Sequence, residues 1–188
     1  MRVIGILLAA GAATRFGGDK LLATLDDGTL VGARSCATLV AALGEVIAVV
    51  RPGDAPLSNA LIKAGARVSV CVESVHGMSA SLAHGIALAT PCDAIVVALA
   101  DMPWVSVSTI AALVAALERG SSLVVPRYRS RRGNPVGFGR AHFNELSTLN
   151  GDRGARDLID RAQSVNWIDV DDAAILSDID TVEDLRRR

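Results

Sequence analysis

The sequence predicts an α/β protein folded as a three-layer sandwich, in which helices cover both faces of a Rossmann-like, mostly parallel sheet. Short aliphatic runs without charge alternate with alanine- and leucine-rich helical patterns along most of the chain. Hydrophobic residues make up 51% of the 188 residues but aromatic residues only 3%, which indicates the aliphatic core that parallel strands form. A chain of this length corresponds to one domain, so residues 1–188 are expected to form a single unit.

The predicted elements follow one another at regular intervals up to residue 126. The first strand, residues 3–8, is aliphatic and uncharged, as in strands buried on both faces. The other predicted strands are 45–50, 67–72, 94–98, 123–126 and 164–170, and the predicted helices are 30–43, 56–64, 77–89, 107–118, 141–146, 155–162 and 181–185. Alternation of this kind predicts right-handed βαβ units. Residues 127–138 interrupt the pattern and indicate a hairpin.

Charge and cysteine usage limit the partners and the compartment. The net charge of −1 creates no overall field that would draw the chain to nucleic acid or to a membrane. No apolar run approaches the roughly 18 residues of a membrane span, and the first run is too short for a secretory signal. Cys36, Cys71 and Cys92 have no metal-type spacing and are interpreted as reduced thiols. We therefore expect a cytoplasmic protein.

Residues 8–20, directly after the first strand, form a loop whose composition suits a polyanion. Small side chains leave backbone N–H groups accessible, as in loops that cradle phosphates. Arg15 and Lys20 add two positive charges. Neither G-x-x-x-x-G-K-[ST] nor G-x-G-x-x-G is present, so a glycine-rich turn with surface charges stays open as the alternative to a nucleoside triphosphate site.

Asp101 follows the fourth predicted strand and is expected at the same sheet edge as this loop, where open α/β sheets bind ligands. One interpretation is that Asp101 caps the next helix, although Ser106 or Ser108 is better placed to do so. The other is that Asp101 is a Mg²⁺ ligand, because magnesium commonly takes one or two carboxylates together with phosphate oxygens and water.

Several motifs together carry a family resemblance that spans residues 8–185. Residues 8–20 match L-A-A-G-x-x-x-R-x-G-x-x-K, the signature loop of nucleotidyltransferases. Within that superfamily the chain most resembles the molybdenum cofactor cytidylyltransferases, through A-D-M-P at 100–103, G-M-x-x-S-L at 77–82, G-x-P at 133–135, G-D-x-G-A-R at 151–156 and D-I-D-T-V-E-D-L at 178–185. Phe16, Asn134 and Val182 depart from the usual methionine, histidine and proline. The resemblance implies a fold of the nucleotide-diphospho-sugar transferase type, with one antiparallel strand in the sheet.

The resemblance also implies roles for individual residues. Arg15, Lys20 and Asp101 would be catalytic; Leu8, Ala9, Ala10, Gly11, Ala12, Gly77, Met78 and Ser81 would bind the nucleotide; Asp101 and Asp180 would hold Mg²⁺; and Asn134, Pro135 and Asp152 would contact the acceptor. Structural alternatives stay open for two of these segments. Ser79 could cap the helix at 77–89, and Asp180 or Thr181 could cap the last helix.

The implied reaction is Mg²⁺-dependent transfer of CMP from CTP to the terminal phosphate of molybdopterin, with release of pyrophosphate. A substrate phosphate is already ionised, so no general base is required, and the sequence contains no legible catalytic triad. Ala10 favours CTP, because guanylyl-transferring relatives carry glycine there, but one methyl group gives only about 1–3 kcal/mol of discrimination. The product would pass to a molybdoenzyme or its chaperone.

Other functions remain compatible with the sequence. The donor could be GTP, the acceptor could be a sugar or polyol phosphate, or the chain could be a non-catalytic nucleotide-binding module. The arginines at 127, 129, 131 and 132 form the strongest local concentration of charge. They are interpreted either as a solvated hairpin or as contacts for the phosphate and dithiolene of the acceptor.

Overall fold

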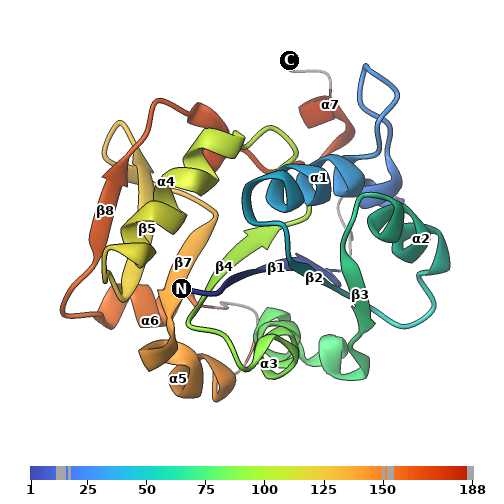
Figure 1. The fold of residues 1–188 in the computed structure, drawn as a ribbon. Helices are drawn as coiled ribbons and strands as arrows, with labels where there is room; N and C mark the ends of the chain where they lie inside the picture. The colour runs from blue at the N-terminus through green and yellow to red at the C-terminus, as the bar shows by residue number, and fades with distance from the viewer. Residues whose placement is uncertain (12–15, 17, 150, 152–154, 186–188) are drawn as a thin grey trace.

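The computed structural model describes residues 1–11, 16, 18–149, 151 and 155–185. Its centre is an eight-stranded sheet in the order β3-β2-β1-β4-β7-β5-β6, with β8 paired to β5 (Figure 1). The strands are β1 (Val3–Ala9), β2 (Val46–Val50), β3 (Arg67–Val70), β4 (Ala94–Leu99), β5 (Leu123–Tyr128), β6 (Arg131–Arg132), β7 (Val136–Gly139) and β8 (Asn166–Asp169). Strands β1 to β4 are mutually parallel, whereas β7 runs antiparallel to both β4 and β5.

Helices cover both faces of the sheet, which confirms the predicted three-layer architecture. They are α1 (Val31–Leu43), α2 (Ala55–Lys63), α3 (Met78–Ala89), α4 (Val107–Glu118), α5 (Phe143–Ser147), α6 (Arg156–Arg161) and α7 (Val182–Leu185), with short 3₁₀ segments η1 (Lys20–Leu22), η2 (Val72–His76), η3 (Arg140–His142) and η4 (Ala173–Leu176). Helices α1, α2 and α4 lie on one side of the sheet in Figure 1, and α3, α5 and α6 lie on the other.

Alternation along the strands produces two aliphatic cores, one under each helical layer. On β1, Leu7 and Ala9 pack toward α1, whereas Ile4 and Ile6 pack toward α3. The three cysteines are free and buried, in agreement with their interpretation as core thiols. Burial raises the pKa of the Cys36 thiol to about 11, which keeps it protonated and unreactive at neutral pH.

The predicted hairpin is present, but its first strand is longer than expected. The sequence-based prediction ended this strand at Pro126, whereas β5 continues to Tyr128 and pairs with β6. Proline lacks only the N–H donor, and the Pro126 carbonyl still accepts a hydrogen bond from the Gly133 backbone at 3.0 Å. The third strand, in contrast, stops at Val70 rather than at residue 72, because the 3₁₀ segment η2 begins at Val72.

The sheet order brings the functional segments to one edge. Strand β1 lies between β2 and β4, so the carboxyl ends of the four parallel strands lie side by side in the order β3, β2, β1, β4. The chain goes from β1 to β2 on one side and later returns to β4 on the other, which makes this edge a switch point where ligands bind.

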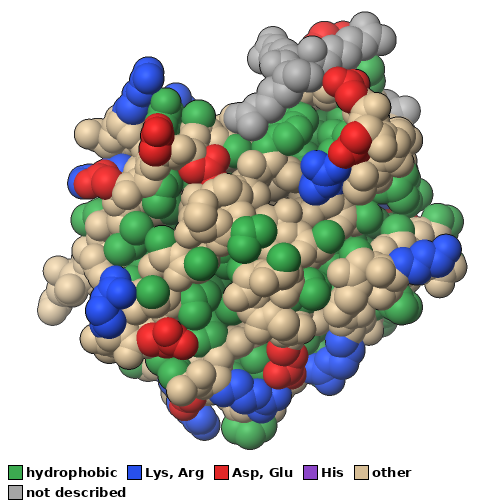
Figure 2. Space-filling view, turned by 45° about the horizontal axis from the view of Figure 1, so that its top comes forward, with side chains coloured by type: hydrophobic (Ala, Val, Ile, Leu, Met, Phe, Trp, Pro, Cys, Tyr) green, Lys and Arg blue, Asp and Glu red, His purple; other side chains and the backbone are tan. Residues whose placement is uncertain are grey.

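The helix character and the surface charge of the described residues bear on the sequence-based expectations for partners. No helix in the described part of the chain combines the length and the apolar character needed to cross a bilayer. On the face shown in Figure 2, positive and negative side chains are interspersed, and the described residues form no continuous basic patch there. This distribution agrees with the net charge of −1.

Candidate functional site

A pocket of about 600 Å³ opens at the carboxyl ends of the parallel strands. It is lined by Leu8, Ala9, Ala10, Gly11, Lys20, Leu21, Arg51, Pro52, Ser74, Val75, Gly77, Met78, Ser81, Leu99 and Asp101. The pocket therefore brings together three sets of residues that the sequence predicted for nucleotide binding and catalysis. Ala12 and Arg15, from the same predicted set, lie outside the described residues.

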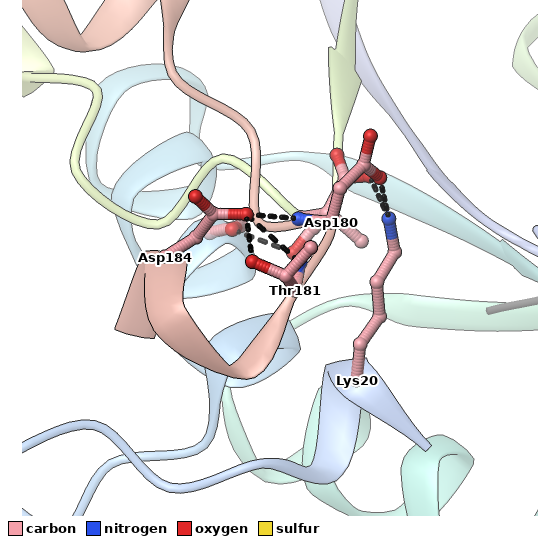
Figure 3. Close-up of polar contacts among 7 residues, drawn as sticks. Lys20, Asp180, Thr181 and Asp184 are labelled. Atoms are coloured by element: carbon pink, nitrogen blue, oxygen red, sulfur yellow. Dashed lines mark hydrogen bonds and ion pairs between the residues drawn. The ribbon is translucent and has the colours of Figure 1, made fainter. Parts of the chain in front are cut away.

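Lys20 connects two carboxylates that are distant in sequence (Figure 3). Its Nζ lies 2.7 Å from Asp101 Oδ2 and 3.1 Å from Asp180 Oδ1. The side chains of Lys20 and Asp101 are only 13% and 19% exposed, so their charges interact in a partly desolvated setting. Burial acts to lower the pKa of Lys20, but the bonds to Asp101 and Asp180 outweigh it and raise the pKa above its usual value.

The two carboxylate oxygens of Asp101 differ in their hydrogen bonding. Its Oδ2 accepts the Lys20 bond, whereas Oδ1 is buried and has no hydrogen-bond partner within the described part of the protein. Burial raises the pKa of Asp101, the nearby Lys20 opposes this shift, and the charge of Asp178 adds to it. A second cation beside the free oxygen would lower the cost of ionising this carboxyl group.

A third carboxylate, Asp178, completes an acidic group that sequence reasoning did not identify. One oxygen each from Asp101, Asp178 and Asp180 lies within 4.8 Å of the others. Asp178 and Asp180 flank Ile179, which is fully buried, so the alternation of an extended segment turns both carboxylates to the same side. This D-x-D spacing was the available signal. Carboxylate oxygens at this separation fit a hard divalent cation, and the unpartnered oxygen of Asp101 is available to it.

The segment that carries these two aspartates is held in place by its own backbone. The Ile179 N–H donates to the Asp101 carbonyl at 2.9 Å, and the Asn134 N–H donates to the Ile175 carbonyl at 3.0 Å. At the start of the segment, Asp172 accepts hydrogen bonds from the Ser106 N–H at 2.9 Å and from the Thr109 hydroxyl at 2.7 Å. These contacts bring residues 172–180 across the sheet edge to Asp101.

The capping alternatives are resolved by the hydrogen bonds. Ser106 caps α4 by accepting from the Thr109 N–H at 3.1 Å, so the Asp101 carboxylate does not serve as that cap. At α7 the acceptor is Asp184, which receives the N–H groups of Asp180 at 3.1 Å and Thr181 at 2.8 Å (Figure 3). The Asp180 carboxylate instead points to Lys20.

Helix α3 begins at the pocket without a side-chain cap. Its first flanking residue, Gly77, has φ of 107°, a conformation that favours glycine. The Ser79 hydroxyl makes no capping bond, and the Ser79 N–H donates to the Gly151 carbonyl at 3.1 Å. Gly77, Met78 and Ser81 line the pocket, as the nucleotide-binding prediction requires.

The predicted acceptor residues lie beside this pocket rather than inside it. Asn134 lines a second pocket of about 300 Å³, which shares Leu8, Met78 and Leu99 with the first. Pro135 lines a small cavity of about 10 Å³, together with Asn134. Asp152 is outside the described residues.

Arg51 is a further pocket residue that sequence reasoning missed. It follows β2 directly, and its guanidinium lies 3.3 Å from Asp19 Oδ2 and 3.3 Å from Asp54 Oδ2. Asp54 is almost completely buried, so the arginine is anchored at the base of the pocket wall. The available signal was its position, since charged residues that end a parallel strand reach the ligand-binding edge.

A mixed, mostly parallel sheet with a small-residue loop, a lysine and three carboxylates at its switch point defines a nucleotidyltransferase. The chain belongs to the family of the MobA-like NTP transferase domain, whose model matches residues 5–165. Membership confirms the resemblance to nucleotidyltransferases and the predicted fold of the nucleotide-diphospho-sugar transferase type.

Known relatives match over nearly their full length. The chain is 34% identical to "Nicotine blue oxidoreductase" of Paenarthrobacter nicotinovorans, over 98% of this chain and 95% of the relative. It is 31% identical to "Purine catabolism protein PucB" of Bacillus subtilis, over 97% and 93% respectively. Among solved structures, Rv0371c of Mycobacterium tuberculosis in complex with manganese is 28% identical, with a TM-score of 0.84 over 100% of this chain and 97% of that one.

Proposed function

We propose that the protein transfers CMP from CTP to the terminal phosphate of a molybdopterin-type acceptor and releases pyrophosphate. The observation that carries this proposal is that one pocket is lined by the small-residue loop, Lys20 and Asp101, and that Asp178 and Asp180 form an acidic group with Asp101. The molybdenum-related acceptor is supported by the motifs at 133–135 and 151–156 and by membership of a MobA-like family. The product then passes to a molybdoenzyme or its chaperone in the cytoplasm.

Asp101, Asp178 and Asp180 hold a divalent cation, Mg²⁺, in this proposal. Bound there, the cation supplies charge neutralisation for the triphosphate and its leaving pyrophosphate. The manganese complex of the relative Rv0371c and the acidic group of this chain support a divalent-metal site. Lys20, now bound to two of the carboxylates, transfers its hydrogen bonds to phosphate oxygens when the nucleotide enters.

The strand order supports a proposed orientation of the nucleotide. Asp101 and the C-terminal carboxylates stand at β4, whereas Ser74 and Arg51 stand at β3 and β2, on the other side of the β1 loop. The phosphates therefore lie toward β4, and the base lies toward α3 and the β2–β3 end, with Gly77, Met78 and Ser81. Backbone N–H groups of residues 8–12 contact the nucleotide, and Arg15 adds a second cation to the triphosphate.

The choice of CTP depends on Ala10, which lines the pocket. Its methyl group occupies space that glycine would leave to a larger base, and this difference gives about 1–3 kcal/mol of discrimination. The acceptor approaches from the side of Asn134 and Pro135, and Asp152 is a further proposed acceptor contact. Its phosphate is the nucleophile and is ionised at neutral pH, so the chain orients the phosphate toward the α-phosphorus without removing a proton.

The test is pyrophosphate release by the purified protein with Mg²⁺ and molybdopterin, comparing CTP, GTP, UTP and ATP. We expect turnover with CTP, and we expect Asp101→Asn to lower it by about 10³-fold while thermal unfolding stays cooperative. Asp171→Asn, a nearby exposed aspartate, is the matched control. Preference for GTP would reject the role of Ala10, and activity only with sugar phosphates would reject the acceptor.

A parallel assay tests the protein for oxidoreductase activity, which the name of one relative states for that relative. Because "Nicotine blue oxidoreductase" is 34% identical to this chain, the same samples are also tested for oxidation or reduction of nicotine blue. Either reaction in the absence of any pyrophosphate release would contradict the proposed CMP transfer.

A further inference from the structure

The second pocket adjoins the nucleotide pocket through a shared wall. Leu8, Met78 and Leu99 line both, so a ligand in one pocket lies against the same side chains as a ligand in the other. Its volume of about 300 Å³ suits a bicyclic or tricyclic molecule rather than a second nucleoside triphosphate. Two substrates, one in each pocket, would both contact Met78 and Leu99.

Apolar side chains of the sheet line the inner part of the second pocket. Val97, Val125, Val136 and Phe138 of β4, β5 and β7 form much of its floor, and all four are buried against the sheet. Such a floor stabilises a planar heterocycle by dispersion and by removal of apolar surface from water.

The charged side chains among the described lining residues of the second pocket are both positive. Among its described lining residues the charged side chains are Arg132 and Arg156, and no carboxylate lines it. Both arginines are solvent-exposed, so a ligand can reach their guanidinium groups. An anionic group on the ligand is therefore favoured, because a guanidinium donates two parallel hydrogen bonds to a carboxylate or phosphate.

The structure distinguishes Arg132 from the other arginines of its hairpin. Arg127 is paired with Asp169 at 2.8 Å and lies over the Trp167 ring, and Arg129 lies over the Tyr128 ring. Arg132 alone of these hairpin arginines lines the second pocket, and its partner Asp160 lies outside that pocket.

We propose that the second pocket binds the acceptor as a planar heterocycle bearing an anionic group, and that Arg132 and Arg156 determine specificity for that charge. This inference rests on the proposed function, which requires an acceptor beside the nucleotide. The inference adds Arg132 and Arg156 as residues that select the charge of the acceptor. The bound heterocycle lies on the apolar floor, and the two arginines bind the anionic group at the rim.

The test uses a matched pair of fluorescent probes, pterin-6-carboxylate and unsubstituted pterin, which differ by one carboxylate on the same ring. Fluorescence titration of the wild-type protein is expected to give about tenfold tighter binding of the carboxylate. Arg132→Gln and Arg156→Gln are each expected to weaken binding of pterin-6-carboxylate by about tenfold and to leave that of pterin unchanged.

Two variants control for indirect effects. Arg131→Gln removes the same charge from the neighbouring position of β6, outside the pocket, and should bind both probes as the wild type does. Asp160→Asn breaks the ion pair of Arg132 without removing the cation, and should bind pterin-6-carboxylate as tightly or more tightly. If Asp160→Asn weakened binding as much as Arg132→Gln did, the effect would be structural and the role of Arg132 would be rejected.

The titration contains no CTP and requires no turnover, so its result is separate from that of the CMP-transfer assay. Equal binding of the two probes by the wild type, or binding of neither, would overturn the inference. Unchanged affinity for pterin-6-carboxylate in either glutamine variant would show that the replaced arginine does not bind the anionic group. Where transfer is observed, both variants should raise KM for the acceptor and leave KM for CTP unchanged.

Discussion

We expect Lys20 to couple the binding of a cation to the binding of a nucleotide. Its ammonium lies between Asp101 and Asp180, two of the carboxylates proposed to hold the metal. A divalent cation and the ammonium therefore compete for the same oxygens until the triphosphate offers Lys20 new acceptors. The lysine thus has opposite effects on metal binding in the free protein and on turnover.

Replacement of Lys20 tests this competition. Lys20→Met should bind Mn²⁺ about tenfold more tightly than the wild type in the absence of nucleotide, because a positive charge has left the site. The same variant should lose turnover by about 10²-fold or more, because the triphosphate loses a cation. Titration followed by electron paramagnetic resonance measures the first effect. Lys63→Met, which changes the other lysine of the chain, is the control, and weaker Mn²⁺ binding by Lys20→Met would contradict the account.

At the scale of elements, the C-terminal segment from Asp172 to Asp180 determines whether the acidic group exists. It crosses Gly133 so closely that a Cβ there would lie 2.6 Å from Ile175 Cγ1 and nearer still to the Ile175 carbonyl oxygen. The backbone carbonyl cannot rotate away, because it accepts the Asn134 N–H. Gly133, in the G-x-P motif, therefore has a structural role in positioning Asp178 and Asp180.

Gly133→Ala should consequently impair a site that it does not touch. The added methyl group displaces the segment, so both the thermal midpoint and the affinity for Mn²⁺ should fall, the latter by about tenfold or more. Calorimetry of unfolding and of Mn²⁺ binding measures the two effects in one preparation. A variant with a lower midpoint but wild-type Mn²⁺ affinity would show that the segment does not position the carboxylates.

The anchor of the same segment gives a prediction for pH dependence. Burial acts to raise the pKa of Asp172, but hydrogen bonds from Ser106, Thr109 and Ala174 outweigh it and hold the pKa below its usual 3.8. A depressed carboxyl pKa contributes stability above the unfolded value, and this contribution disappears as pH falls from 3.8 through the lower folded value.

Asp172→Asn should therefore destabilise the protein near neutral pH and matter less in acid. We expect a loss of about 1 kcal/mol in the free energy of unfolding at about pH 7, which shrinks as the pH falls from 3.8 through the lower folded value. Urea denaturation at a series of pH values measures the difference from the wild type, with Asp171→Asn as the control. A difference that grew as pH fell would contradict the assigned hydrogen bonds.

At the scale of the whole molecule, the sequence predicted the parallel half more completely than the rest. Uncharged runs such as residues 3–8 identify buried strands because both of their faces need apolar side chains. Beyond Pro126 the pattern fails, since β5 continues through a proline and β6 has only two exposed residues. Pairing across a hairpin is stabilised by tertiary partners that local periodicity does not encode.

The same division applies to the site. Lys20, Asp101 and Asp180 were identified from local motifs, and the structure brings them within hydrogen-bonding distance. Asp178 and Arg51 were missed because their proximity to the pocket depends on strand order and on the path of a segment distant in sequence. The choice among the hairpin arginines required the pocket itself, since their sequence context is nearly uniform.

At the scale of the whole molecule, the two adjoining pockets, which share Met78, are proposed to hold the donor and the acceptor. The central claim is that the acceptor phosphate attacks the α-phosphorus of CTP. The most direct test compares CTP labelled with ³²P at the α-position and at the γ-position, with molybdopterin and Mg²⁺. The account predicts that the α-label appears in the acceptor product and the γ-label in pyrophosphate. A γ-label on the acceptor, or an α-label found only in free CMP, would contradict it.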